Sequence, residues 1–433
     1  MTTETAAPPA AAAESARGYR SLVLGLLLAV YVLNFVDRQI VGILVEPIKA
    51  DLQLTDAQLG LMGGFAFALF YTTLGIPLAW AADRFNRMWI IAAALTVWSA
   101  MTALCGMAQN YFQLVIARVL VGVGEAGGGP PSQSMISDYF PPEERPKALG
   151  IWALGIPIGS ALGVLLGAYV AANYGWRAAF FAAGAPGVLL AIVFALVVRE
   201  PPRGRFDPPT RGAQPSLGRT FAVLLSRPTF LLVTMGASLA SAVGYSLFFW
   251  GAAYFIRRFG VDLQTVSYFS AFVIGVAASA GSYLGGALAS RHGRRDARFI
   301  MLIPAVGLLL AAPTNALALS TNEALLAAAI ALIPTLLGSM WYGPLFAVVQ
   351  NMVEPRMRAM AIALMLFVVN LIGLGGGPTL AGQLSTAFSF AYGPAEGLRL
   401  SLLVVVAIQA LAALLMGAAA LTVRADLAKA SEA

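Results

Sequence analysis

The sequence from 79 to 87, AWAADRFNR, interrupts a long apolar run with three charged residues. A related stretch, GALASRHGRR at 286–295, follows it at an offset of 207 residues. Another pair of loops, RPKA at 145–148 and RMRA at 356–359, repeats at an offset of 211 residues. Two loop pairs at nearly the same offset indicate an internal duplication. Parallel repeats of this kind in transporters place a substrate site between the two copies.

The apolar runs between these loops are long enough to cross a bilayer. Of the 433 residues, 59% are hydrophobic and only 11% are charged, whereas soluble domains carry about 25% charged residues. A membrane-spanning helix needs about 20 apolar residues. We therefore predict an all-α membrane protein of twelve transmembrane helices in two pseudo-symmetric six-helix bundles. The expected helices are 21–45, 58–82, 89–108, 112–136, 147–171, 176–198, 229–256, 264–289, 299–318, 324–350, 358–385 and 399–423.

Composition also divides the chain outside the helices. The first residues are rich in Ala and Pro and lack an early Lys or Arg, so we expect a disordered tail rather than a signal peptide. An Arg- and Pro-rich segment between the two copies is typical of a semi-extended linker. The predicted organisation is a cytoplasmic tail at 1–19, a first bundle at 20–198, a cytoplasmic linker at 199–227, a second bundle at 228–424 and a cytoplasmic tail at 425–433.

Basic residues orient the chain, because cytoplasmic loops are enriched in Lys and Arg. Of the 27 basic residues, 20 fall on the side of both termini and the even-numbered connections. We therefore expect a multi-pass protein of a bacterial-type inner membrane, with both termini cytoplasmic. The net charge of +7 is explained by contact with anionic lipid. Hence we expect the lipid bilayer as a partner and no nucleic acid.

Several kinds of chemistry are excluded. A single cysteine, Cys105, permits no intrachain disulfide, and a single histidine, His292, permits no histidine metal cluster. No lysine is followed by Ser or Thr, so the phosphate-binding GxxxxGK[ST] loop is absent. His292 lies in a loop and Cys105 has no acidic neighbours in sequence, which argues against a membrane enzyme. We expect no catalytic residues, no metal and no cofactor, with a proton gradient as the energy source.

Away from the ends of the predicted spans, four charged residues fall within them: Asp37, Arg38, Arg118 and Glu125. A charge near the bilayer centre costs about 2.5–3.5 kcal/mol, so these residues need partners or water. Asp37 and Arg118 lie at similar depths and could pair. Glu125 is seven residues from Arg118, hence on the same helix face and about 10 Å away along the axis. Glu125 therefore has no obvious partner in the sequence.

These charges permit two interpretations. Asp37, Arg118 and Glu125, supported by Asn34 and Arg38, could couple proton movement to substrate binding, because a carboxylate whose proton affinity depends on conformation or occupancy is what coupling requires. Alternatively, Asp37 and Arg118 could form a structural clamp beside an inert Glu125. Intramembrane ionisable groups are functional by default, which favours coupling. Arg38 points away from Asp37 and could either snorkel or bind an adjacent helix.

The second copy lacks deep charges and offers aromatic and amide side chains instead. We predict that its wall of a central cavity is formed by Tyr245, Phe249, Trp250, Tyr342 and Asn370. A cavity with acids and arginines on one wall and aromatic rings on the other suits an amphipathic substrate with a charged head and an acyl tail. A monomer suits this duplicated architecture.

Three motifs carry a resemblance to a known family. The loop at 79–87 and the motif RVLVGVG at 118–124 resemble the major facilitator superfamily over essentially all of residues 20–424. LNFVDR at 33–38, with Glu125 after the second motif, is similar to the Spinster branch of that superfamily. That branch is associated with proton-linked export of lysophospholipids and sphingoid phosphates. The resemblance therefore implies a proton-coupled, alternating-access exporter of a lipid-like substrate.

The resemblance leaves one rival function and adds one site. Some importers of small organic anions, such as sugar acids and carboxylates, share an Asp-Arg pair like Asp37-Arg38, so an importer is the alternative. The charges of Asp83, Arg84 and Arg87 lie at a helix end. In the family such a cluster latches the two halves when the transporter opens outward, whereas charges that only fix topology would occur in the same place.

Overall fold

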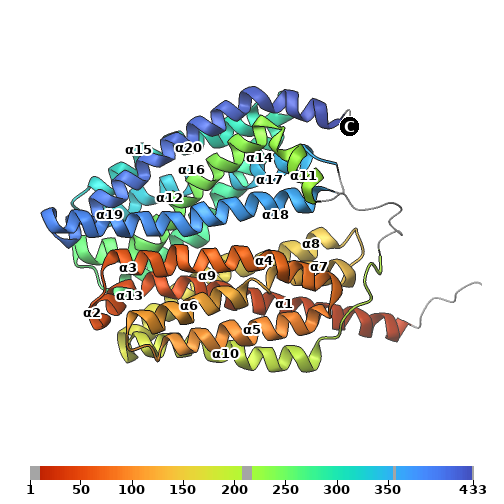
Figure 1. The fold of residues 1–433 in the computed structure, drawn as a ribbon, viewed down its shortest axis with the longest axis horizontal. Helices are drawn as coiled ribbons and strands as arrows, with labels where there is room; N and C mark the ends of the chain where they lie inside the picture. The colour runs from red at the N-terminus through yellow and green to blue at the C-terminus, as the bar shows by residue number, and fades with distance from the viewer. Residues whose placement is uncertain (1–9, 207–216, 355–356, 432–433) are drawn as a thin grey trace, which may run out of the picture.

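The computed structural model describes residues 10–206, 217–354 and 357–431. Within these ranges every regular element is helical, and twelve helical spans are long and apolar enough to cross a membrane. The twelve expected helices are therefore confirmed. Figure 1 shows them in two layers, with α1 to α10 in one layer and α12 and α14 to α20 in the other, while α13 lies beside α9 of the first layer.

Six spans come from the first half of the chain. In order, its elements are α1 (Ala10–Ile43), α2 (Val45–Leu52), α3 (Asp56–Leu61), η1 (Met62–Ala66), α4 (Phe67–Arg84), α5 (Arg87–Cys105), α6 (Tyr111–Glu125), α7 (Gly129–Tyr139), α8 (Arg145–Ala153), α9 (Gly155–Tyr174) and α10 (Trp176–Val197).

The second half repeats the pattern. Its elements are α11 (Leu217–Leu225), α12 (Pro228–Phe259), α13 (Leu263–Phe272), η2 (Val273–Ala278), α14 (Ser279–Gly293), α15 (Phe299–Ser320), α16 (Ala324–Gly338), α17 (Tyr342–Asn351), α18 (Arg358–Val369), η4 (Asn370–Gly376), α19 (Gly377–Tyr392) and α20 (Pro394–Ser431).

Different elements lie at the two ends of the molecule. The start of α1 and the end of α20 lie at one end, which we call the terminal end (Figure 1). The helices α2, α3 and α13 and the C-terminal part of α19 lie near the opposite end, which we call the far end (Figure 1). Positions along the long axis of the molecule are named below by these two ends.

Two expectations about the segments outside the spans are wrong in part. Helix α1 begins at Ala10, inside the tail expected to be disordered. The linker contains the helix α11, and α20 continues through the expected C-terminal tail to Ser431. In α11, Thr220 and Leu224 are buried on one face, so packing stabilises a helix where composition alone indicated an extended chain. Residues 1–9, 207–216 and 432–433 lie outside the described residues.

Several spans are interrupted in the middle. The π-helical segments η1 and η4 interrupt their spans, and they pack against each other across the two halves. The glycines and proline at 375–378 lie at the end of η4 and the start of α19. A π-helical turn holds an extra residue and occurs frequently at functional sites. The span of α6 and α7 is interrupted directly after Glu125.

The glycines repeated every four residues in α9 pack against α1. A methyl group on Gly159 would lie 2.3 Å from the Val32 carbonyl oxygen, and one on Gly163 would lie 2.8 Å from the Val36 carbonyl oxygen. Small residues at this spacing allow helix backbones to approach closely. Because α1 and α9 belong to the same half, this stripe is a packing surface within one bundle.

We expect Gly159→Ala to lower the stability of the folded protein by about 1–3 kcal/mol, because the helices must separate to admit the methyl group. Thermal unfolding in detergent, followed by intrinsic fluorescence, measures the effect. Gly25→Ala in α1 is the control, since no atom lies within 4 Å of the added methyl group. Equal melting temperatures for the two variants would contradict the close contact.

Candidate functional site in the central cavity

The four intramembrane charges lie on α1 and α6, which meet within the first half. Asp37 is 1% exposed, and Arg118 and Glu125 are each 2% exposed. The sequence brings α6 close to its neighbours through glycine: a methyl group on Gly124 would lie 2.7 Å from the Trp98 amide nitrogen. Helix α6 ends at Glu125, so this carboxylate sits where the span is interrupted.

Glu125 forms an ion pair with Arg38. The Arg38 Nε donates to Glu125 Oε2 at 2.6 Å, and the Arg38 side chain is 15% exposed while the Glu125 side chain is fully buried. Of the alternatives for Arg38, the structure supports binding to an adjacent helix. Removing one partner of a buried ion pair costs about 3–5 kcal/mol, because the other charge is left uncompensated.

Asp37 and Arg118 are neighbours, but they do not form the expected side-chain pair. Arg118 Nη1 donates to the backbone carbonyl of Asp37 at 3.4 Å. Among the described residues, neither carboxylate oxygen of Asp37 has a hydrogen-bond partner, and the Nε of Arg118 also lacks one. The site therefore contains a buried acid and a buried base with unused hydrogen-bonding capacity.

The direction of the Cα–Cβ bond explains which pair forms. Side chains on a helix tilt toward its N-terminus, and α1 starts at the terminal end (Figure 1). The long side chain of Arg38 therefore leans toward the terminal end. Glu125 lies in the same direction, since it ends α6 seven residues after Arg118. Matching depths of Cα atoms, on which the expected pairing of Asp37 with Arg118 depended, did not account for this tilt.

Three aromatic rings surround the guanidinium of Arg38. Its central carbon lies 5.2 Å from the ring centroid of Phe35, 5.6 Å from that of Phe67 and 4.4 Å from that of Tyr71. Arg118 lies 5.1 Å from the same Phe67 ring. Cations within about 6 Å of a ring centroid are attracted by the ring quadrupole. The two arginines of the site thus share one aromatic side chain.

A cavity of about 50 Å³ lies beside these charges, between the two halves. Its charged and polar wall includes Arg38, Gln39 and Arg118, and the opposite wall comes from α12, η4 and α19. The apolar lining is formed by Phe35, Val41, Gly63, Phe67, Tyr245, Phe248, Phe249, Leu374 and Pro378. This volume has room for a few water molecules.

The five residues predicted to form the second half's wall of the cavity lie in different environments. Tyr245 and Phe249 line the cavity. Trp250 is buried and donates from its indole nitrogen to the Pro378 carbonyl at 3.0 Å, so it joins α12 to α19. Tyr342 is 41% exposed and stacks on Trp341. Asn370 begins η4. Asn34, predicted to support the charges, is buried one turn before Arg38.

The charges expected to form a latch bind within their own half and the linker. Arg87 is 1% exposed and pairs with Asp138 at 2.5 Å and with Glu200 at 2.7 Å. Arg203 of the linker donates to the backbone carbonyl of Asp83. Arg84 donates to the Trp80 carbonyl and lies over the ring of that tryptophan. None of these contacts involves a residue of the second half in this conformation.

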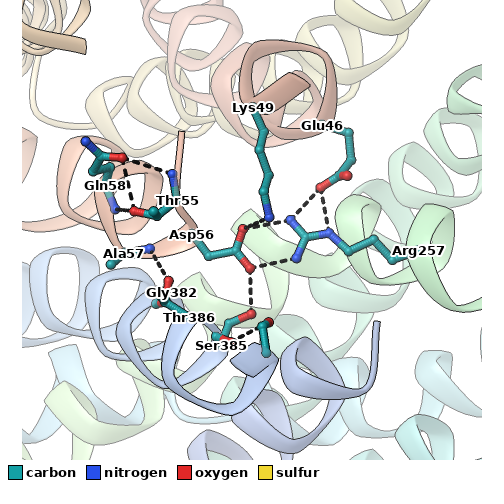
Figure 2. A network of polar contacts seen from close by, with 11 residues as sticks. Glu46, Lys49, Thr55, Asp56, Ala57, Gln58, Arg257, Gly382, Ser385 and Thr386 are labelled. Atoms are coloured by element: carbon teal, nitrogen blue, oxygen red, sulfur yellow. Dashed lines mark hydrogen bonds and ion pairs between the residues drawn. The ribbon is translucent and has the colours of Figure 1, made fainter. Parts of the chain in front are cut away.

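A second charged cluster joins the halves at the far end (Figure 2). We call it the outer network, and it consists of Glu46, Lys49, Asp56, Arg257 and Ser385. Arg257 of α12 donates to Glu46 at 2.6 Å and to both oxygens of Asp56 at 2.6 and 2.9 Å. Lys49 and the Ser385 hydroxyl each donate to Asp56 at 2.6 Å. Asp56 is thus held by residues from both halves.

Two threonines of α19 extend this contact to the backbone. The Thr386 hydroxyl accepts from the Ala57 amide at 2.8 Å, and the Thr379 hydroxyl accepts from the Phe65 amide at 3.0 Å. Ala57 lies in the first turn of α3, where amides have no partner within the helix, and Phe65 lies in η1. Hydrogen bonds between the two halves therefore continue from the outer network toward the cavity. They follow the contact of α3 and η1 with η4 and α19, which we call the seam.

The outer network is the part of the site that the sequence did not predict. Arg257 lies just after the end of its predicted span at 229–256, and Asp56 lies just before the start of its predicted span at 58–82. The signal available in the sequence was Thr55-Asp56 followed by Gln58, since Thr with Gln three residues later forms a capping box. That box is present, and it orients Asp56 in the first turn of α3.

Comparisons with known proteins show the family of this chain. Residues 27–378 match the family described as Major Facilitator Superfamily. An "MFS-type efflux pump" of Mycolicibacterium smegmatis is 33% identical over 414 residues, 93% of each chain. "Protein spinster homolog 1" of Mus musculus is 29% identical over 392 residues, 85% of this chain and 74% of that protein.

A solved structure extends the comparison to three dimensions. It is a bacterial homologue of the human lysosomal transporter Spinster in an inward-facing, unoccupied conformation. It superposes with a TM-score of 0.87 at 33% identity, over 94% of this chain and 98% of that one. The family makes the chain a transporter rather than an enzyme. The chain belongs to the major facilitator superfamily and, within it, to the Spinster-like transporters.

Proposed function

We propose that this protein is a proton-coupled secondary transporter that exports an amphipathic, lipid-like substrate by alternating access. The observation that supports this most is the Arg38–Glu125 ion pair, which lies beside a cavity between the two halves. Because the carboxylate of this ion pair is fully buried, its charge interacts strongly with any ligand or proton that enters the cavity. The sequence predicts a functional role for the same acids and arginines, because they lie within predicted membrane spans.

The coupling step follows from the charges. When Glu125 is ionised, it can hold a cationic group of the substrate, and the displaced Arg38 then becomes available to an anionic group in the cavity. When Glu125 takes up a proton, it no longer holds the cationic group, and the substrate is released. Asp37 lies close to the same charges, and among the described residues its carboxylate oxygens have no hydrogen-bond partner, so it provides a second place for the proton. Competition between proton and substrate for the same pair of residues is the physical basis of exchange.

The substrate class follows from the two walls of the cavity. Arg38 and Arg118 suit a phosphate or carboxylate, and Tyr245, Phe248 and Phe249 suit an apolar chain. A lysophospholipid or sphingoid phosphate has both parts. An importer of small organic anions would bind hydroxyl groups on its second wall as well, and the lining there is largely apolar.

Alternating access needs a closed end and an open end that exchange. In this conformation the outer network and the seam of α3, η1, η4 and α19 join the halves at the far end. The positive-inside rule places the terminal end in the cytoplasm, so a form joined at the far end corresponds to the inward-facing conformation described for the relative. Opening outward requires the outer network to break and the cluster around Asp83, Arg84 and Arg87 to contact the second half.

The proton gradient supplies enough energy for this exchange without a cofactor. One proton moving down one pH unit yields about 1.4 kcal/mol, and one charge crossing 100 mV yields about 2.3 kcal/mol. Since each 1.4 kcal/mol is a tenfold ratio, the two together hold a substrate gradient of several hundred-fold in a one-for-one exchange. The bilayer of a bacterial-type inner membrane and a monomeric chain complete the proposal.

We expect Glu125→Gln and Asp37→Asn each to abolish pH-driven flux, because neither amide can exchange a proton. The measurement is lysolipid flux in proteoliposomes with an imposed pH gradient. Glu143→Gln is the control, since Glu143 is exposed at the terminal end. Gel filtration and melting temperature verify that the variants fold.

Two results of that experiment would reject the proposal. Wild-type flux that is independent of the gradient and unchanged in Glu125→Gln would exclude proton coupling by this residue. Uptake of sugar acids or other small carboxylates without any lysolipid movement would favour the organic-anion importer. Gradient-driven lysolipid flux that is lost in both amide variants and retained in Glu143→Gln would support the exporter.

We expect Arg257→Gln to increase the population of the outward-open form at least tenfold, because it removes the contacts of Arg257 with Glu46 and Asp56. Spin labels on Gln53→Cys and Glu323→Cys, in a Cys105→Ala background, report the far-end distance by double electron–electron resonance. Arg258→Gln is a matched control, because Arg258 binds Asn322 and Glu396 within its own half. An identical distance distribution in both variants would exclude the outer network as a lock.

A further inference from the structure

We propose that the turn between α14 and α15 binds the phosphates of an anionic phospholipid in the leaflet at the terminal end. Four arginines form the site, which we call the arginine turn: Arg291, Arg294, Arg295 and Arg298. The ligand is a resident lipid of the bilayer and stays at the protein surface. It is therefore distinct from a transported substrate, and the inference goes beyond the proposed function.

The arginine turn lies where two spans of the second half leave the membrane. Arg291 falls in the last turn of α14, Arg294 caps the C-terminus of that helix, and Arg298 directly precedes α15. An ion pair of Asp296 with Arg424 at 2.6 Å joins the turn to the last part of α20, which lies at the terminal end (Figure 1). Because both neighbouring helices are long and apolar enough to cross a membrane, the turn lies at the level of the lipid head groups.

The positive charge of this turn is not neutralised within the protein. All four arginines are exposed, and their guanidinium groups form no hydrogen bond or ion pair with the part of the chain that the structure describes. The acid of the turn, Asp296, accepts from the Arg298 amide at 2.9 Å and from Arg424 at 2.8 Å. These contacts lower the pKa of Asp296, and its charge is already compensated by Arg424 from another helix.

The first copy of the repeat shows how such an arginine is neutralised internally. The offset of 207 residues places Arg294 on Arg87. Arg87 is 1% exposed and pairs with Asp138 and Glu200. Asp138 precedes the loop RPKA by seven residues, and the residue seven before the matching loop RMRA is Val349. Because Val349 is buried in an apolar cluster, the second copy has no carboxylate at this position, and its arginines are left for an anion from outside.

The surfaces beside the turn fit acyl chains. Leu284 and Leu288 of α14 and Phe299 and Leu302 of α15 are large apolar side chains that are 37–40% exposed. They lie within the membrane-crossing segments, and Leu288 is only one helical turn before Arg291. A soluble anion would contact the arginines alone, whereas a phospholipid also covers the apolar side chains below them. Basic residues next to membrane spans attract anionic lipids for this reason.

The number of arginines favours a lipid with two phosphates. The planar donors of one guanidinium bind two oxygens of a phosphate together, so four arginines within residues 291–298 provide for more than one phosphate. Diphosphatidylglycerol carries two phosphates joined by a glycerol, and each is close to the membrane surface. It matches the turn in charge and in position, whereas phosphatidylcholine brings a cation next to its single phosphate.

Lipid titration of purified protein in detergent tests the site. We expect wild type to bind diphosphatidylglycerol at least tenfold more tightly than phosphatidylcholine, as measured by native mass spectrometry. Arg294→Gln combined with Arg298→Gln should weaken diphosphatidylglycerol binding about tenfold, because half of the phosphate-binding groups are removed. Arg294→Lys combined with Arg298→Lys keeps the charge and should lose less affinity than the glutamine pair.

The matched control is Lys147→Gln combined with Arg205→Gln. Both residues are exposed in loops of the first half at the terminal end, so this pair removes the same two charges from the same end of the molecule. The control should bind diphosphatidylglycerol as wild type does, and melting temperatures verify that all variants fold. Equal loss of affinity in the two glutamine pairs would show general attraction to a basic surface and would overturn the site.

Two further comparisons separate the lipid from other ligands. Inorganic pyrophosphate carries two phosphates without acyl chains, and we expect an equimolar amount not to displace the lipid. Displacement would identify a site for a soluble anion and reject the lipid, as would equal binding of diphosphatidylglycerol and phosphatidylcholine by wild type. Glu125→Gln should bind diphosphatidylglycerol like wild type, because the arginine turn is separate from the central cavity. Loss of binding in that variant would place the lipid in the cavity and contradict the proposal.

Discussion

The proposed function depends on one ion pair, Arg38 with Glu125, whose carboxylate is fully buried. In bulk water two such charges attract each other weakly, but in a medium of low dielectric their attraction and the cost of separating them both rise steeply. Such a pair cannot be broken by thermal motion alone and needs a proton or a ligand to replace one partner. In the proposed function the chemistry of the cavity is therefore an exchange of partners at Arg38 and Glu125.

The outer network places a similar constraint on the movement of the two halves. Asp56 accepts hydrogen bonds from Lys49 in its own half and from Arg257 and Ser385 in the other. All of these bonds cross or border a single seam, so they break together when the halves separate at the far end. The cavity lies along that seam from the network, with Gly63, Phe249 and Pro378 in its lining. Substrate binding and gate opening are thus adjacent events on the same helices.

The fold was predictable because hydrophobic length and loop repeats are one-dimensional properties of a sequence. The twelve spans and their division into two bundles follow from these alone. The pairing of charges was not predictable in the same way. Asp37 and Arg118 have matching depths, yet their side chains point along different directions and only the backbone carbonyl of Asp37 is reached. The tilt of the side chains and the length of arginine determine which acid pairs with which arginine. Their effect depends on how the two helices face each other.

The outer network was missed for a related reason. Asp56 precedes its predicted span by two residues, and in sequence it resembles an ordinary polar residue at a helix start. Its partner Arg257 is 201 residues away, so no local pattern connects them. Contacts between the two copies of a duplicated fold cannot be predicted from the sequence pattern of each copy alone. The latch cluster shows the same limit, because Arg87 is buried by Asp138 and by Glu200 of the linker.

The two facing π-helical segments have a consequence for comparing relatives. Each holds an additional residue relative to a regular helix, and one residue rotates the remainder of a helix by about 100°. In η4 this rotation sets the direction of everything from Pro378 onward, including Thr379 and Ser385, which bind the first half. A homologue without the extra residue would present a different face there. An alignment through 370–376 consequently requires a one-residue gap for such a homologue, and gap-free alignments would assign the wrong side chains to the seam.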